Sequence, residues 1–99
     1  MNTPRAFFAS TSVADQYLYV FGGMSDYRIV NSIEKYDVVT DTWISLYFKL
    51  PMPLSKHSAV SIDQKTILIF GGMSADFEPV NNVWSLDLNI AKFTMKRSM

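Results

Sequence analysis

Leu18-Tyr19-Val20-Phe21-Gly22-Gly23 is an apolar run that stops at a double glycine. It returns 49 positions further on, from 18 to 67, as Ile67-Leu68-Ile69-Phe70-Gly71-Gly72. A short apolar run bounded by turn residues is typical of a buried strand. A period near 50 residues indicates a repeat architecture with one supersecondary unit per repeat. The two runs therefore predict two copies of one β-unit, residues 1–50 and residues 51–99.

The remaining sequence aligns around these runs. The offset is 49 up to the double glycine and 50 afterwards, so that Tyr36 aligns with Leu86, Asp37 with Asp87 and Trp43 with Phe93. Alternating and β-branched stretches between turn residues predict four strands in each unit. The expected strands are 6–13, 17–22, 32–37 and 43–48 in the first unit, and 56–62, 66–71, 83–87 and 93–96 in the second. We expect loops over 24–31 and 73–81, because Pro79 disfavours a strand in the second loop.

These residues resemble the kelch repeat, whose pattern is a strand ending in a double glycine, a variable loop, Tyr-Asp, and a Trp seven residues after the Tyr. The first unit has Gly22, Gly23, Tyr36, Asp37 and Trp43 at these positions. The second unit keeps Gly71, Gly72 and Asp87 and replaces the two aromatic residues with Leu86 and Phe93. The resemblance implies two four-stranded antiparallel blades of a β-propeller. Tyr36, Trp43, Leu86 and Phe93 are expected in the core, and the two aspartates are expected to bind the turns that follow them.

Two blades are fewer than the four to eight of a typical propeller. A two-blade unit leaves an apolar face bare at each end, and repeat arrays need about three or more units for stability. The sequence therefore leaves two readings open. Either the chain is part of a longer propeller, or several copies pool their blades.

The composition restricts the function. The chain of 99 residues is 48% hydrophobic, has a formal net charge of zero and contains no cysteine. A neutral chain lacks the basic surplus that nucleic acid or an anionic membrane attracts. No cysteine and one histidine leave too few ligands for a zinc or copper site. We expect no cofactor, no metal and no catalytic residues, and a soluble cytoplasmic location, since no signal peptide or membrane-length run is present.

The resemblance implies that loops on one propeller face bind a protein. These loops precede the first strand of each blade or follow the double glycine. Binding energy at protein interfaces concentrates in aromatic and Arg residues. The candidates in these loops are Arg5, Tyr27, Arg28, Lys56, His57, Asp76, Phe77 and Glu78. Structural alternatives stay open. Arg5 and His57 are also suited to bonding the backbone of an adjacent blade, Tyr27 and Phe77 to packing on a blade edge, and Asp76 and Glu78 to solvation.

We therefore predict a non-catalytic protein-interaction module whose partner is a protein. The partners that the resemblance implies are actin-associated or related to ubiquitin ligases, together with neighbouring blades from the same chain or from other copies. One alternative is a structural segment of a larger cytoskeletal or ciliary assembly. A minor alternative is part of a kelch-like oxidase.

Overall fold

A computed structural model describes residues 5–98 and contains ten strands in this range. No helix of the described residues is long and apolar enough to cross a membrane. The strands are β1 (Ala9–Val13), β2 (Tyr17–Phe21), β3 (Met24–Ser25), β4 (Arg28–Ile29), β5 (Ile33–Asp37), β6 (Thr42–Ser45), β7 (Ser58–Ser61), β8 (Thr66–Met73), β9 (Pro79–Asp87) and β10 (Lys92–Ser98).

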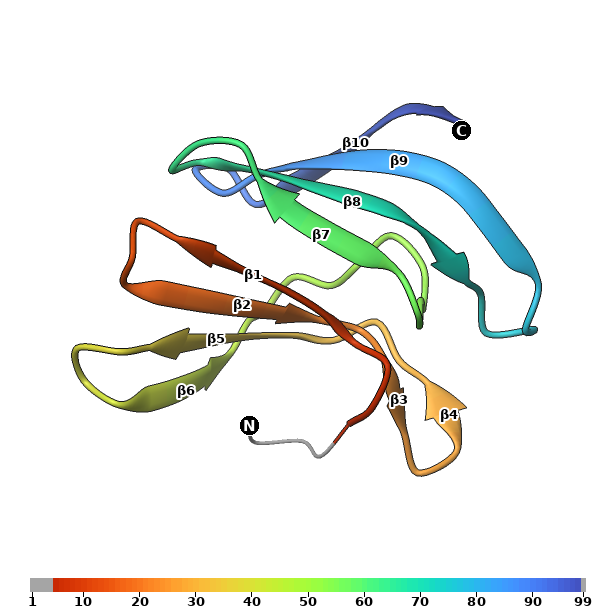
Figure 1. The fold of residues 1–99 in the computed structure, drawn as a ribbon, viewed down its shortest axis with the longest axis horizontal. Helices are drawn as coiled ribbons and strands as arrows, with labels where there is room; N and C mark the ends of the chain where they lie inside the picture. The colour runs from red at the N-terminus through yellow and green to blue at the C-terminus, as the bar shows by residue number, and fades with distance from the viewer. Residues whose placement is uncertain (1–4, 99) are drawn as a thin grey trace.

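Eight of the strands form two four-stranded sheets (Figure 1). The first has the order β1-β2-β5-β6 and the second the order β7-β8-β9-β10, with antiparallel neighbours throughout. We call them blade 1 and blade 2. The small hairpin β3–β4 projects from blade 1. The all-β class and the two four-stranded blades predicted from the sequence are confirmed.

The blades stack through unlike faces. β1 lies beside β7, where the Ser61 hydroxyl donates to the Ser12 carbonyl at 2.8 Å and the Ser61 amide donates to Thr11 Oγ1 at 3.1 Å. Alternation along each strand sends one set of side chains from each blade into a shared core. Blade 1 contributes Val13, Tyr19, Phe21 and Ile33, and blade 2 contributes Ile67, Ile69, Trp84 and Leu86.

The linker between the blades packs against the first double glycine at Leu54. Gly22 and Gly23 have φ angles of 58° and 96°, in the left-handed region that favours glycine. The Gly23 amide donates to the Leu54 carbonyl at 2.7 Å. A Cβ on Gly22 would lie 2.6 Å from that same oxygen, and a Cβ on Gly23 would lie 2.7 Å from the Ala6 carbonyl. The motif therefore provides both a turn and the space for two passing backbones.

The two Asp positions bind their turns as predicted. Asp37 Oδ1 accepts a hydrogen bond from the Val39 amide, and Asp87 Oδ1 accepts one from the Asn89 amide, both at 2.9 Å. Each turn then passes through a left-handed residue, Asp41 at φ 54° or Ala91 at φ 53°. The same turn is thus built twice from different side chains.

Two details of the predicted strands are wrong. The prediction placed Pro79 in a loop, but β9 begins at Pro79, which pairs with Met73 at the far end of β8. A proline is tolerated as the first residue of a strand, where its missing amide is not needed. The predicted loop 24–31 also contains the short hairpin β3–β4, in which Met24 pairs with Ile29.

Tyr36 and Trp43 are also not in the core. Their rings pack against each other at 4.9 Å between centroids on the face of blade 1 that points away from blade 2, and both are only half-buried. Their counterparts differ, since Leu86 is fully buried between the blades and Phe93 packs against the core. The signature residues therefore lie on the same face of each blade. In blade 2 this face packs against blade 1, whereas in blade 1 the other blade does not cover it.

Replacing Gly23 by alanine is expected to destabilise the chain by about 2–4 kcal/mol, because left-handed strain and a backbone clash act together. Urea unfolding followed by circular dichroism measures the change. Ala14→Gly is the matched control, since Ala14 already has a φ of 58° in an exposed turn. The control should shift stability by less than about 1 kcal/mol. An equal effect of both variants would contradict the close-approach argument.

Candidate functional site

Four connecting segments gather at one end of the two blades. Segment 5–8 precedes β1 and pairs with the β3–β4 hairpin through an Ala6–Met24 bridge. Segment 54–57 precedes β7 and pairs with the end of β8 through a Ser55–Met73 bridge. The Lys56 amide donates to the Phe7 carbonyl at 2.8 Å, which joins the two sets. We call this end, which includes the 74–78 loop, the loop face; it lies on the right of Figure 1.

Each blade presents two large side chains here from left-handed backbone. Phe7 and Lys56 occupy equivalent positions, with φ angles of 58° and 55°. Tyr27 and Phe77 are the second equivalent pair, at 65° and 60°. All four are exposed, and Tyr27 is 97% accessible. Left-handed geometry costs a bulky residue about 1–3 kcal/mol and persists only where the surroundings impose it. The backbone bridges supply that restraint, so the loop face holds its aromatic residues outward.

Phe7 is a surface residue that sequence reasoning missed. The run Ala6 to Val13 reads as one strand, which predicts Phe7 as part of a sheet. The structure begins β1 only at Ala9 and leaves Phe7 exposed, with Lys56 Nζ 5.1 Å from the centre of its ring. A signal existed in the repeat alignment, because Phe7 is the counterpart of Lys56, which was selected.

The predicted loop residues separate into two groups. Tyr27, Arg28, Lys56, Asp76, Phe77 and Glu78 are exposed on the loop face, and their binding role stays a prediction. Arg28 is on β4, whereas Asp76 and Glu78 flank Phe77 in the loop between β8 and β9. The side chains of Arg5 and His57 are instead buried, which places neither on the exposed surface of the loop face and fits a structural role for each.

Arg5 ties the start of blade 1 to its own sheet. Its guanidinium donates to the carbonyls of Gly22 at 2.8 Å and Ser32 at 3.1 Å, and Nη2 lies 2.9 Å from Glu34 Oε2. The two side chains are 0% and 1% exposed. A buried charge pair with further hydrogen bonds compensates the loss of hydration. Blade 2 has Leu54 and Trp84 at the equivalent positions, so an apolar pair replaces the ionic one.

Arg5→Leu should destabilise the chain by about 3–5 kcal/mol, because it leaves the Glu34 carboxylate buried without its cation. The double variant Arg5→Leu/Glu34→Leu should be more stable than Arg5→Leu alone, since both charges are then gone. A double-mutant cycle by urea unfolding measures the coupling. Simple addition of the two single losses would contradict the pairing.

His57 lies inside the loop face. It is buried against the Gly72 backbone, and a Cβ on Gly72 would lie 2.7 Å from the His57 Cβ. Neither ring nitrogen forms a hydrogen bond of good geometry with the described residues. Burial lowers the pKa of His57 to about 4, and the Phe21 carbonyl opposes this shift only in part. His57 is therefore neutral near pH 7 and serves as packing.

The low pKa of His57 predicts acid sensitivity. The unfolded chain binds a proton near pH 6.5 and the folded chain only near pH 4, so this contribution is complete above pH 6.5 and is lost as the pH falls to 4. The loss amounts to up to about 3 kcal/mol. His57→Phe, which copies Phe8 of blade 1, should remove this component from unfolding curves measured between pH 7 and pH 4. Parallel pH profiles for the two proteins would refute the assignment.

Chemistry-bearing groups are sparse in the described residues. No group of three or more His, Cys, Asp or Glu in residues 5–98 is placed to hold a metal ion. A polar depression of about 490 Å³ lies at the opposite end of blade 2, lined by Asp63, Gln64, Lys65 and Asn89. A second one, on blade 1, is about 410 Å³ in volume. Both are away from the loop face, which consists of projecting side chains.

Two stacked four-stranded antiparallel blades, each with a left-handed double glycine after its second strand, define the chain as part of a β-propeller. The KLHDC2/KLHL20/DRC7 Kelch-repeats domain matches residues 1–98. The chain therefore belongs to the kelch-repeat family.

Several curated proteins are similar to the chain. Beta-scruin of Limulus polyphemus is 32% identical over 85% of this chain and 11% of its own length. Kelch-like protein 40 of Xenopus tropicalis is 33% identical over 85% of this chain and 14% of its own. N-acetylneuraminate epimerase of Vibrio cholerae is 32% identical over 65% of this chain and 18% of its own. The chain thus spans less than a fifth of each of these three relatives.

Proposed function

We propose that the chain is a non-catalytic protein-interaction module that presents the loop face to a protein partner. The observation that carries the proposal is the repeated left-handed geometry of Phe7, Lys56, Tyr27 and Phe77. Backbone held in an unfavourable conformation concentrates at functional sites. Aromatic anchors that are already fixed lose little conformational entropy on binding, which favours affinity.

The family supports a partner that is a protein. Kelch domains are commonly interaction modules, and Kelch-like protein 40 and beta-scruin are among the relatives. An actin-associated or ubiquitin-ligase-related partner, a structural role in a larger assembly and a cytoplasmic location remain predictions from the resemblance.

The proposal includes no catalysis by this chain. N-acetylneuraminate epimerases are among the relatives, which makes sugar-acid epimerisation the enzymatic alternative. His57 is the sole histidine and is buried with a pKa of about 4, so it is poorly suited to proton transfer near pH 7. An NMR assay with N-acetylneuraminate distinguishes the two functions, since epimerisation would contradict this part of the proposal.

The double variant Tyr27→Ala/Phe77→Ala should lose a protein partner, with binding weakened at least about tenfold, while stability changes by less than about 0.5 kcal/mol. Quantitative affinity capture compares it with wild type, and titration by calorimetry then measures each protein that is lost. Val39→Ala is the control, because Val39 is exposed in the β5–β6 turn at the opposite end. Arg28→Ala should likewise leave stability unchanged.

The expected result is a protein that binds wild type and Val39→Ala but not the double variant. If capture finds no such protein, the loop face is not the binding site. A large loss of stability in the double variant would instead make these aromatic residues structural.

A further inference from the structure

Each blade has one face that the other blade does not cover. On blade 1 this face carries Leu18, Tyr36 and Trp43, together with Ser12. On blade 2 it carries Val60, Leu68 and Phe70, with Ile62 beyond the end of β7. A group of apolar side chains on a sheet face that no other blade covers indicates a contact surface.

The repeat alignment relates both open faces to the contact that already exists. Leu18, Tyr36 and Trp43 are the counterparts of Ile67, Leu86 and Phe93, which blade 2 packs against blade 1. The open face of blade 2 corresponds in the same way to the Val13, Tyr19 and Phe21 face of blade 1. The two open faces are therefore the two halves of one interface, present at opposite ends of one chain.

We propose that a second copy of this chain binds head to tail, with its blade 2 open face on the blade 1 open face. In this contact, blade 1 of one copy packs on blade 2 of the other copy in the same way as blade 2 packs on blade 1 within a chain. Such an interface is heterologous, because different surfaces meet, and it closes into a ring if the rotation permits. Propellers close with four to eight blades, which corresponds to about two to four copies.

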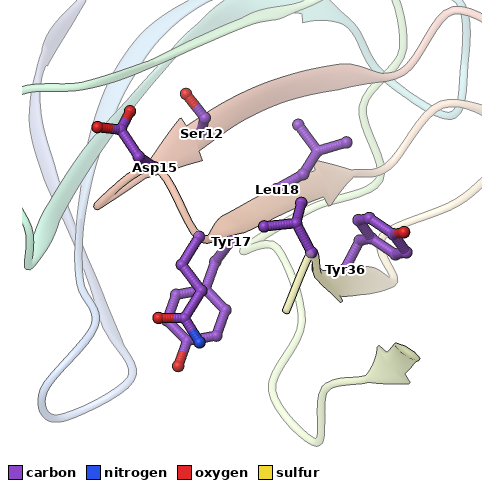
Figure 2. A pocket seen from close by; sticks show the side chains of 7 residues that line it. Ser12, Asp15, Tyr17, Leu18 and Tyr36 are labelled. Atoms are coloured by element: carbon purple, nitrogen blue, oxygen red, sulfur yellow. The ribbon is translucent and has the colours of Figure 1, made fainter. Parts of the chain in front are cut away.

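A depression on blade 1 marks where the contact is made. It has a volume of about 410 Å³, and Figure 2 shows Leu18 and Tyr36, which pair across β2 and β5, at this site. Val13 belongs to the buried cluster that holds the counterparts of these two residues, Ile67 and Leu86. Ile62 is the counterpart of Val13 and is 58% exposed. The geometry assigns the depression to Ile62 of the second copy.

One hydrogen bond between the blades repeats as well. Within the chain the Ser61 hydroxyl donates to the Ser12 carbonyl. Ser12 is the counterpart of Ser61 and is exposed. In the head-to-tail contact its hydroxyl donates to the carbonyl of Ser61 in the second copy. The neighbouring bond to Thr11 does not repeat, because its counterpart Val60 has no hydroxyl.

The test uses native mass spectrometry and light scattering of the 99-residue chain. Wild type should form one discrete oligomer, whereas Ile62→Glu and Ser12→Glu should each remain at the monomer mass of 11.3 kDa. An equimolar mixture of the two variants should form a dimer, because one intact face of each kind remains. Ile90→Glu is the matched control, since Ile90 is 65% exposed in the β9–β10 turn, and it should assemble as wild type does.

Near-UV circular dichroism verifies that each variant is folded. If a glutamate variant does not fold, the lysine variants Ile62→Lys and Ser12→Lys take the place of Ile62→Glu and Ser12→Glu. A folded wild-type monomer would overturn the proposal and assign the open faces to blades outside this chain. The proposal would also be overturned if Ile62→Glu or Ser12→Glu kept the wild-type oligomer mass, or if either variant dimerised alone through like faces. A mixture of the two variants that stays monomeric would overturn it as well.

Discussion

The structure depends on a backbone contact, the approach of the Leu54 carbonyl to the double glycine at 22–23. The Gly23 amide binds this oxygen at 2.7 Å, and a Cβ on Gly22 would lie 2.6 Å from it. Two requirements therefore coincide, since the strand must turn through left-handed φ and a second backbone must pass without side-chain bulk. The contact anchors the linker on blade 1 and so places β7 beside β1. The stacking of the two blades follows from that placement.

Stacking by repetition makes the two faces of a blade different. The face that blade 1 turns to its neighbour carries Tyr19 and Phe21, whereas the matching face of blade 2 carries Ile67 and Ile69. Both faces mix aromatic and aliphatic side chains, since blade 1 also contributes Val13 and Ile33 and blade 2 also contributes Trp84, and together they fill one core. The copies have also diverged where packing allows it, since the Arg5–Glu34 ion pair of blade 1 is an apolar pair in blade 2. Both versions leave no charge buried alone.

Features that repeat along the chain could be predicted from the sequence, whereas features that depend on partners distant in sequence could not. The strands, both glycine pairs and the turn-binding Asp37 and Asp87 follow from period and local chemistry. The inward direction of Arg5 does not, because its carboxylate partner is 29 positions away and a polar residue before a strand suits a surface equally well. The exposure of Phe7 was missed for the opposite reason, since an aromatic residue in an apolar run reads as core. The start of β9 at Pro79 could not be predicted either, because it depends on pairing with Met73 at the far end of β8.

The two blades carry different charges on the loop face. Tyr27 is followed by Arg28 on one blade, and Phe77 lies between Asp76 and Glu78 on the other, although the left-handed aromatic position is the same in both. The sheet faces have to remain complementary to one another, which limits how far they can change. The loops carry no such constraint beyond their backbone bridges, so charge can vary there without loss of the fold. If the loop face binds a protein as proposed, affinity comes from the fixed aromatic residue and selectivity from the charges beside it, so that the two can be varied separately.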